Sequence, residues 1–323
     1  MNIIKKLALA LVMTLIMTVM VFAQPVRIIT SGGMSGAFVD MIVANILIEM
    51  GYEVEGPIRM KTAVRYTALA TGDADITTQG WYPLHSKYKE QYGKSLLLVG
   101  KIFSGGNDGF VIDKATADKY GITSISDFAN PDIAKLFDTD NNGKANFVGC
   151  PAGWSCNDLA KAIFEELGIA GNIDFQAGEY DPSIADVIAR YKNGQSVFYY
   201  MWTPNYVASA IPLGTESVWL NSEYKTSGGS VEAKNEWGCI TNPCHLVVVN
   251  DVVAVVNPVF AKDNARVIKL LEQLQVPIAD IVALAGRVYN ESLSKDDVNE
   301  LAKAWIANNR ETVDKWLFNV SNN

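Results

Sequence analysis

Three tryptophans follow short apolar segments in loops rich in glycine and proline: Trp81, Trp154 and Trp202. The face of an indole ring carries partial negative charge and attracts a bulky, weakly hydrated cation such as a trimethylammonium group. That group has no N–H to donate, so an aromatic cage suits it better than a carboxylate. Core packing is the alternative role, and we expect it for Trp305 and Trp316, which lie on helical patterns. Three indoles around one cleft would form a box for a quaternary ammonium ligand.

The segment that contains Trp154 also offers a site for an anion. Ser155 or Asn157 would cap a helix that the apolar spacing predicts over 159–167, with Asp158 in its first turn. The free N–H groups and the positive dipole end of a helix N-terminus bind anions. Ordinary capping without a ligand is the alternative. Beside a tryptophan cage, these N–H groups would hold the carboxylate of a zwitterion.

The two histidines are expected to have different roles. His85 follows Trp81 by four residues, and its ring N–H would donate to the same carboxylate if it lay in the cleft. A structural hydrogen bond is the alternative, and it is what we expect for His245. No serine or cysteine nucleophile stands with a base and an orienting acid at recognisable positions. The sequence therefore predicts a binding protein rather than an enzyme. An exported hydrolase of choline or betaine esters is the rival that needs such a nucleophile.

A run of oxygen-bearing side chains fits the first nine positions of a calcium-binding loop. The oxygen ligands would come from the side chains of Asp138, Asp140, Asn142 and Asn146 and from the backbone carbonyl of Lys144. Position 12 of the loop is glycine, so the bidentate glutamate of such loops is missing from the local sequence. A solvated Asx-rich turn is the alternative. A calcium ion here would have a structural role.

The four cysteines form two close pairs, Cys150 with Cys156 and Cys239 with Cys244. In an oxidising compartment, such close pairs favour local disulfides. The rival is a zinc site built from the cysteines and His245, but neither pair has the tight C-x-x-C spacing of structural zinc. We therefore expect two disulfides.

The first 23 residues have the pattern of a secretory signal peptide. Lys5 and Lys6 precede an apolar run over 7–22, and Ala23 is a small residue suited to cleavage before Gln24. A retained anchor is the alternative, but the run is short for a membrane-spanning helix. The mature chain then has 25 basic and 35 acidic residues, a net charge of −10. We expect a periplasmic protein without affinity for nucleic acid, and the hydrophobic fraction of 49% excludes a disordered chain.

Strand and helix patterns alternate along the mature chain and predict α/β lobes with mostly parallel sheets. Two units share one order of helix, glycine, strand and Trp-x-Pro loop, and they end at Trp81 and Trp202. A strand over 109–112 would leave the first lobe, and a strand over 245–250 would return to it. We expect the ligand in the cleft between the lobes. The predicted segments are 24–108 and 246–323 for the first lobe and 109–245 for the second.

Three segments carry a resemblance to a known family: GDADITTQGWYPLH at 72–85, KLFDTDNNGKANFVGCPAGWSC at 135–156 and RYKNGQSVFYYMWTP at 190–204. On these, nearly the whole mature chain resembles the periplasmic glycine betaine/proline betaine-binding proteins of ABC transporters. The resemblance implies a type II-like periplasmic binding protein, with two mixed or parallel sheets flanked by helices and joined by a two-strand hinge. Such a protein closes on its ligand and presents it to a permease in the inner membrane.

The resemblance also implies a role for six residues. The tryptophan box falls on Trp81, Trp154 and Trp202, and the carboxylate contacts fall on His85 and on the backbone N–H groups of Ser155 and Cys156. Ser155 stands where glycine is usual, a change that a backbone contact survives. We expect a monomer that binds glycine betaine or proline betaine for osmoprotection. Trimethylamine N-oxide, choline and carnitine also fit an aromatic cage and are the alternatives, as is a calcium-stabilised surface protein with no small ligand.

Overall fold

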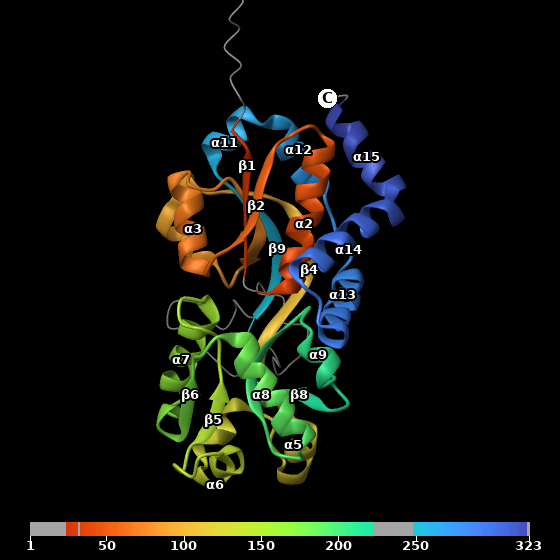
Figure 1. Ribbon diagram of the computed structural model, residues 1–323. Coiled ribbons are helices and arrows are strands. Elements are labelled where there is room, and N and C mark those ends of the chain that lie inside the picture. Colours follow the sequence, from red (N-terminus) through yellow and green to blue (C-terminus); the bar gives the residue numbers. More distant parts are fainter. Residues whose placement is uncertain (1–23, 32, 223–247, 322–323) are drawn as a thin grey trace, which may run out of the picture.

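The computed structural model describes residues 24–31, 33–222 and 248–321, which form two lobes joined by long strands (Figure 1). The predicted signal peptide, the pair Cys239 and Cys244, and His245 lie outside the described residues. Within the described part of the chain, no helix has the length and apolar character needed to cross a membrane.

The first lobe combines the N-terminal and C-terminal parts of the chain, and it lies above the second in Figure 1. Its strands are β1 (Val26–Thr30), β2 (Val54–Arg59) and β3 (Ile76–Tyr82). Its helices are α2 (Met34–Glu49), α3 (Thr62–Thr71), α4 (Ser86–Tyr92), α11 (Pro258–Asp263), α12 (Ala265–Gln273), α13 (Ile278–Glu291), α14 (Lys295–Asn308) and α15 (Arg310–Ser321). Strand β1 pairs in parallel with β2 and β3.

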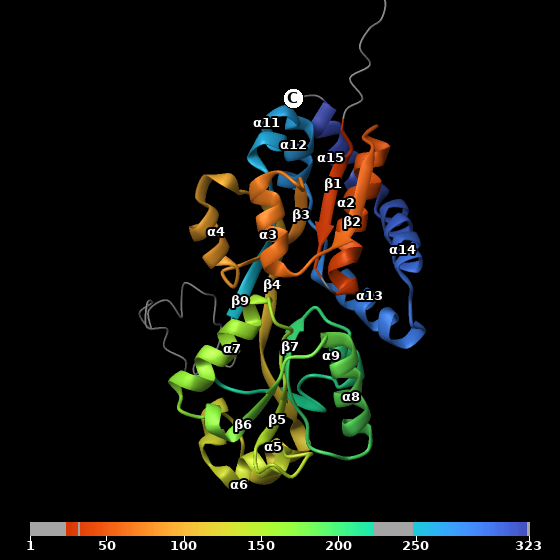
Figure 2. The same cartoon turned by 60° about the vertical axis from the view of Figure 1, so that its left-hand side comes forward.

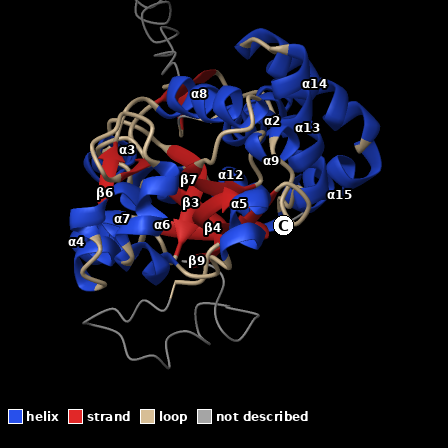
Figure 3. Ribbon diagram, turned by 90° about the horizontal axis from the view of Figure 1, so that it is seen from below, coloured by secondary structure: helices blue, strands red, loops and turns tan. Residues whose placement is uncertain are grey.

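The second lobe is built from the middle of the chain. Its strands are β5 (Ala145–Val148), β6 (Ile173–Gln176), β7 (Phe198–Thr203) and β8 (Ser217–Trp219). Its helices are α5 (Lys114–Tyr120), α6 (Pro131–Ala134), α7 (Ser155–Glu166), α8 (Tyr180–Lys192) and α9 (Val207–Ala210). Strand β5 pairs in parallel with β6 and β7, as expected for strands linked by helical crossovers. Figure 3 shows helices of both lobes around the strands.

Two strands connect the lobes, as the sequence predicts, but their bounds differ from the expected 109–112 and 245–250. β4 (Leu97–Asp113) runs out of the first lobe, and β9 (Val248–Val256) returns to it. They pair antiparallel with each other, and β4 also pairs with β7 while β9 pairs with β3 (Figure 2). The two sheets are therefore not separate: the strands follow one hydrogen-bonded order, β2-β1-β3-β9-β4-β7-β5-β6, with β8 on β4.

Each lobe has its own apolar core. In the first lobe, α2 is apolar on nearly every side, and Val39, Ile42 and Val43 are fully buried between the sheet and α14. In the second lobe, phenylalanines dominate, and Phe128 stacks on Phe198 with ring centroids 4.4 Å apart. Two separate cores allow the lobes to move as rigid bodies about β4 and β9.

The two Trp-x-Pro units occupy matching positions in the two lobes. In the first lobe, α3 ends at Gly72 in the left-handed conformation and β3 follows. In the second lobe, α8 is followed by Gly194 and then β7. Trp81 and Trp202 were expected in loops, but they belong to the ends of strands, because both strands continue to the residue before the proline. Each tryptophan therefore stands at a strand end that faces the other lobe.

Candidate functional site

A cavity, here called the cleft cavity, lies between the lobes. Its lining includes all six residues that the sequence analysis selected for ligand binding: Trp81, His85, Trp154, Ser155, Cys156 and Trp202. The first two come from β3 and the turn after it, and the other four come from the second lobe. The structure thus brings together residues from distant parts of the chain in one cavity.

Aromatic rings gather on both sides of the cleft cavity. In the second lobe, the rings of Trp154 and Trp202 lie 5.7 Å apart at 62°. Tyr180 supports both rings from α8, with its centroid 4.6 Å from that of Trp202. In the first lobe, Trp81 packs edge to face on Phe103 at 5.8 Å. Aromatic side chains thus line the cavity from both lobes, and a cation cage is built from such side chains.

Gly106 on β4 makes room for the ring of Trp81. A Cβ atom at this position would lie 2.7 Å from Cζ3 of Trp81, closer than van der Waals contact permits. Strand β4 also shifts its register against β9 between Ser104 and Gly106, and such bulges re-aim neighbouring side chains. The absence of a side chain at Gly106 therefore fixes where the first-lobe indole stands.

The hydrogen bonds of His85 define its tautomer. The backbone N–H of Trp81 donates to Nδ1 of His85 over 3.2 Å, and the hydroxyl of Tyr66 lies 3.0 Å from the same nitrogen. A backbone N–H can only donate, so Nδ1 is unprotonated and the ring proton is on Nε2. Burial, together with the charges of Arg65 and Lys87, holds the pKa of His85 well below its usual range. The ring is therefore neutral, with its Nε2–H left to donate.

The start of α7 differs in one respect from the expected cap. Neither Ser155 nor Asn157 is the N-cap; Trp154 takes that position in extended conformation, without a side-chain cap bond. Ser155 and Cys156 are the first two residues of the helix, so their backbone N–H groups have no carbonyl partner within it. Asn157 instead uses its side-chain amide to donate to the carbonyl of Cys150 over 2.7 Å. The free N–H groups that the prediction needs are thus at the start of a helix that begins one residue after Trp154.

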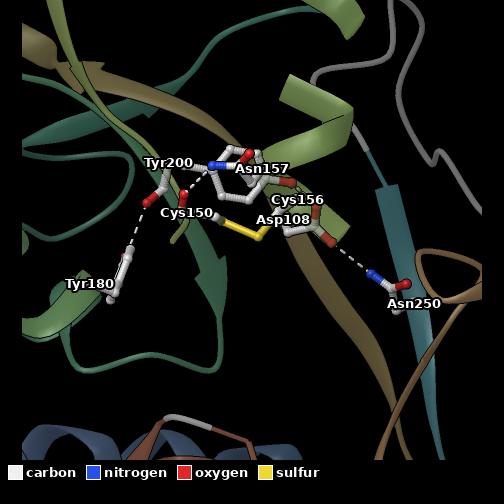
Figure 4. The surroundings of a disulfide bond; sticks show 7 residues. All are labelled: Asp108, Cys150, Cys156, Asn157, Tyr180, Tyr200 and Asn250. Carbon is white, nitrogen blue, oxygen red and sulfur yellow. Dashed lines mark hydrogen bonds between the residues drawn. A yellow bond between two sulfur atoms is a disulfide. The ribbon is translucent and has the colours of Figure 1, made fainter. Parts of the chain in front are cut away.

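The predicted disulfide between Cys150 and Cys156 is present, with an S–S distance of 2.07 Å (Figure 4). It ties the loop before α7 to the first turn of the helix. The bond from Asn157 to Cys150 ties the same two segments a second time. Both constraints hold Trp154 and the free N–H groups of the helix start in a fixed relation.

Several lining residues escaped the sequence analysis, above all Arg65, Gln79, Asp108 and Tyr200. For Arg65 a signal existed: it lies three residues after Thr62 and four before Leu69, on the buried face of α3. A charged residue on an apolar helix face calls for a partner. Nothing in the sequence distinguishes Asp108, because its surroundings come from β7 and β9.

Ion pairs cross the rim of the cleft. Lys87 Nζ lies 2.6 Å from the carboxylate of Asp158, and Arg59 Nη2 lies 3.4 Å from that of Asp181. All four side chains are exposed, and exposed pairs contribute only about 0–1 kcal/mol each. The lobes therefore meet at the rim, but these contacts alone bind them weakly.

The loop with the predicted calcium ligands lies before β5, away from the cleft cavity. The carboxylate of Asp138 accepts backbone N–H groups of Asp140, Asn142 and Gly143. The side-chain oxygen of Asn146 accepts from the backbone N–H and hydroxyl of Thr139. These are the bonds of an Asx-rich turn, and within the described residues no group of three or more His, Cys, Asp or Glu side chains gathers around a metal site. The carboxylates and amides suit calcium chemically, so the ion stays a prediction.

Comparison with known proteins gives a consistent result. The family model described as the substrate-binding domain of ABC-type glycine betaine transport systems matches residues 24–308. The glycine betaine/proline betaine-binding periplasmic protein of Escherichia coli (strain K12) is 34% identical over 282 residues, which cover 87% of this chain and 85% of that protein. A glycine betaine-binding periplasmic protein of Dickeya dadantii (strain 3937) is 32% identical over 283 residues, again 87% and 85% of the two chains.

Solved structures show the same fold. The lactococcal glycine betaine-binding protein OpuAC, in its closed form with glycine betaine, superposes with a TM-score of 0.69 and 18% identity. The superposition covers 91% of this chain and 99% of that one. The two-lobed periplasmic binding protein fold expected from the sequence is thereby confirmed, and the chain belongs to the family of substrate-binding domains of ABC-type glycine betaine transport systems.

Proposed function

We propose that this protein is exported to the periplasm, captures glycine betaine or proline betaine there, and delivers it as a monomer to an ABC permease in the inner membrane for osmoprotection. The observation that carries the proposal is the convergence of indole rings from both lobes with a neutral histidine and a helix N-terminus in the cleft cavity. The signal peptide would be removed after Ala23.

In this proposal the two ends of the ligand are recognised by different chemistry. Trp81, Trp154 and Trp202 enclose the quaternary ammonium group, whose charge is attracted to the ring faces. The carboxylate accepts hydrogen bonds from Nε2 of His85 and from the backbone N–H groups at the start of α7. Donors at a helix N-terminus carry partial positive charge, which suits an anion.

Ligand binding and closure are coupled because the binding groups are divided between the lobes. Trp81 and His85 move with the first lobe, whereas Trp154 and Trp202 move with the second. A ligand held by both sets favours the closed arrangement through its greater affinity for it. The rim ion pairs are weak, and the lobes also meet where Tyr206 stacks on Tyr289; a ligand held by both lobes adds to the free energy that keeps them together. The permease would then distinguish loaded from empty protein by the relation of the lobes.

Trimethylamine N-oxide, choline and carnitine are alternative ligands, because each presents a methylated nitrogen to an aromatic cage. Choline has no carboxylate and needs neither His85 nor the start of α7. A thermal-shift screen of the mature protein tests the proposal: a tight ligand stabilises by RT ln(1 + [L]/Kd), about 4 kcal/mol at a thousandfold excess over Kd. Betaines should give the largest shift, whereas no shift with any methylated ammonium compound would refute the proposal.

We also propose a structural calcium ion in the loop of Asp138, for which the oxygen-rich composition is the support. Elemental analysis after dialysis without chelator should find about one calcium per chain. Metal-free protein would refute this proposal without touching the one on the ligand.

A further inference from the structure

Asp108 is a buried carboxylate that lines the cleft cavity beside the second-lobe indoles. It is 1% exposed, and its Cα stands opposite that of Trp202 in the β4–β7 ladder. Directly opposed residues project their side chains from the same face of a sheet. The carboxylate of Asp108 therefore lies on the face that carries the ring of Trp202.

The hydrogen bonds of Asp108 fix its position and leave its charge unpaired. One oxygen accepts from the hydroxyl of Tyr200, and the other accepts from the amide of Asn250 over 2.7 Å (Figure 4). Both donors are neutral. Asp108 belongs to none of the ion pairs found in the described part of the chain. Burial raises the pKa of Asp108 to about 7, against the opposing effect of these two hydrogen bonds.

Arg65 has the opposite charge and a similar situation. It is 1% exposed and lines the same cavity from α3. Its Nη2 donates to the carbonyl of Gln79 over 3.1 Å, while Nε and Nη1 have no hydrogen-bond partner among the described residues. Asp40 is close enough to interact electrostatically, but it lies outside ion-pair distance and accepts hydrogen bonds from Thr78. Arg65 thus retains donors that no protein group uses.

Two buried charges of opposite sign line one cavity without forming an ion pair with each other, which is costly in the empty protein. Asp40 compensates the charge of Arg65 at longer range, so a cation alone would compensate Asp108 and leave Nε and Nη1 of Arg65 without an acceptor. A molecule that carries both charges compensates both residues at once. Compensation by the ligand explains why Asp108 and Arg65 remain buried although they form no ion pair with each other.

We infer that Asp108 and Arg65 make the cleft cavity selective for a zwitterion: Asp108 is the counter-charge of the ligand's quaternary ammonium group, and Arg65 is the counter-charge of its carboxylate. The inference rests on the proposed function, since it names the charges by which the same cavity recognises its ligand. Neutral His85 supplies a directed hydrogen bond to the carboxylate, whereas Arg65 supplies the charge. Asp108 thus serves betaines and choline alike, whereas Arg65 decides between them.

The test compares two ligands in four variants. Glycine betaine carries both charges and choline carries only the cation, and their affinities are measured by calorimetric titration. Asp108→Asn removes the negative charge and keeps the hydrogen-bonding shape, because the Tyr200 hydroxyl can accept as well as donate. Asp113→Asn is the matched control: Asp113 is a buried carboxylate on the same strand that accepts two backbone N–H groups and does not line the cavity. Arg65→Met removes the positive charge, and Arg65→Lys retains it.

Each substitution should change the two affinities in its own way. Asp108→Asn should weaken glycine betaine and choline alike, by about 30-fold or more. Arg65→Met should weaken glycine betaine by a similar factor and leave choline unchanged or bound more tightly. Arg65→Lys should recover part of the betaine affinity, and Asp113→Asn should bind both ligands like the wild type.

The opposite results overturn the inference. The inference is refuted if Asp108→Asn binds glycine betaine with wild-type affinity, or if Arg65→Met loses affinity for glycine betaine and choline equally. Either result leaves the proposed function intact. A wild type that binds no methylated ammonium compound would refute the proposed function itself. Circular dichroism of the ligand-free variants controls for folding. If Arg65→Met does not fold, Arg65→Lys and Asp108→Asn decide. The inference is overturned if both of these variants bind glycine betaine and choline with the affinities of the wild type.

Discussion

Lowering the pH from 8 to 6 should weaken glycine betaine binding about tenfold through protonation of Asp108. Its pKa in the ligand-free protein is raised to about 7 by burial, so about nine tenths of the protein carries an ionised Asp108 at pH 8 and about one tenth at pH 6. Only the ionised form attracts the ligand cation. The observed affinity follows that fraction, and binding at pH 6 releases nearly one proton.

Other groups around the cavity do not produce this dependence. Burial holds the pKa of Tyr200 well above its usual range and that of His85 well below it, so neither changes charge between pH 6 and 8. Burial lowers the pKa of Arg65, but the guanidinium stays charged over the same range. Asn250 does not titrate, and Asp181 on α8 faces the cavity from its rim. Burial also raises the pKa of Asp40, which interacts with Arg65, to about 6, but Asp40 is not among the residues that line the cavity. Asp108 is thus the cavity-lining group expected to change charge in this window.

The assay is calorimetric titration at pH 6, 7 and 8, each in two buffers of different ionisation enthalpy. The difference between buffers gives the number of protons released. Asp108→Asn should bind weakly with no pH dependence and no proton release. An affinity for glycine betaine that is constant from pH 8 to 6 in the wild type, or an equal pH dependence in Asp108→Asn, would refute the reasoning.

The sign for stability is opposite to that for binding. Asp108 has a folded-state pKa above its unfolded value, so the folded protein binds the extra proton between about pH 4 and 7. The contribution of this group to the stability of the ligand-free protein therefore decreases as the pH rises through 7. Saturating ligand should remove the difference, because it favours the ionised carboxylate.

Three further outcomes follow from the site. His85→Ala should weaken glycine betaine by about tenfold or more, the effect of losing a hydrogen bond to a charged group, and leave choline nearly unchanged by titration; an equal loss for both would refute the carboxylate contact. Gly106→Ala should displace the ring of Trp81 and reduce binding of every methylated ligand with little loss of melting temperature, and unaltered affinity would contradict the packing argument. Replacing Cys150 and Cys156 by serine should lower the free energy of unfolding by about 2 kcal/mol and weaken betaine binding. An unchanged free energy of unfolding in denaturant titration and an unchanged affinity in calorimetry would show that the disulfide does not stabilise the loop.

The sequence contained enough to place the indoles but not the charges. Trp81 and Trp202 could be matched because a repeated local order of helix, glycine and strand precedes each, and a proline follows each two residues later. The partners of Asp108 are Tyr200 and Asn250, which lie 92 and 142 positions further along the chain. No local pattern encodes such contacts. The signal that remained was Arg65, a charge on the apolar face of α3.

The limits of the secondary-structure prediction have a similar physical origin. β4 was expected only over 109–112, because glycines at 100, 105 and 106 interrupt its apolar pattern and two of them have positive φ. Such glycines occur at bulges, where a strand bends without ending. β2 was not expected. Most of its side chains are exposed, so it lacks the apolar pattern by which a strand is predicted. Long-range pairing, rather than local propensity, defines both strands.

We propose that the cleft cavity binds a quaternary ammonium zwitterion through the tryptophan box. The most direct measurement is calorimetric titration of the mature protein with glycine betaine, beside the variant Trp154→Ala. We expect saturable one-to-one binding that weakens by about 30-fold or more in the variant, since a desolvated cation–π contact is worth about 2 kcal/mol. No binding by the wild type, or equal binding by both proteins, would contradict it.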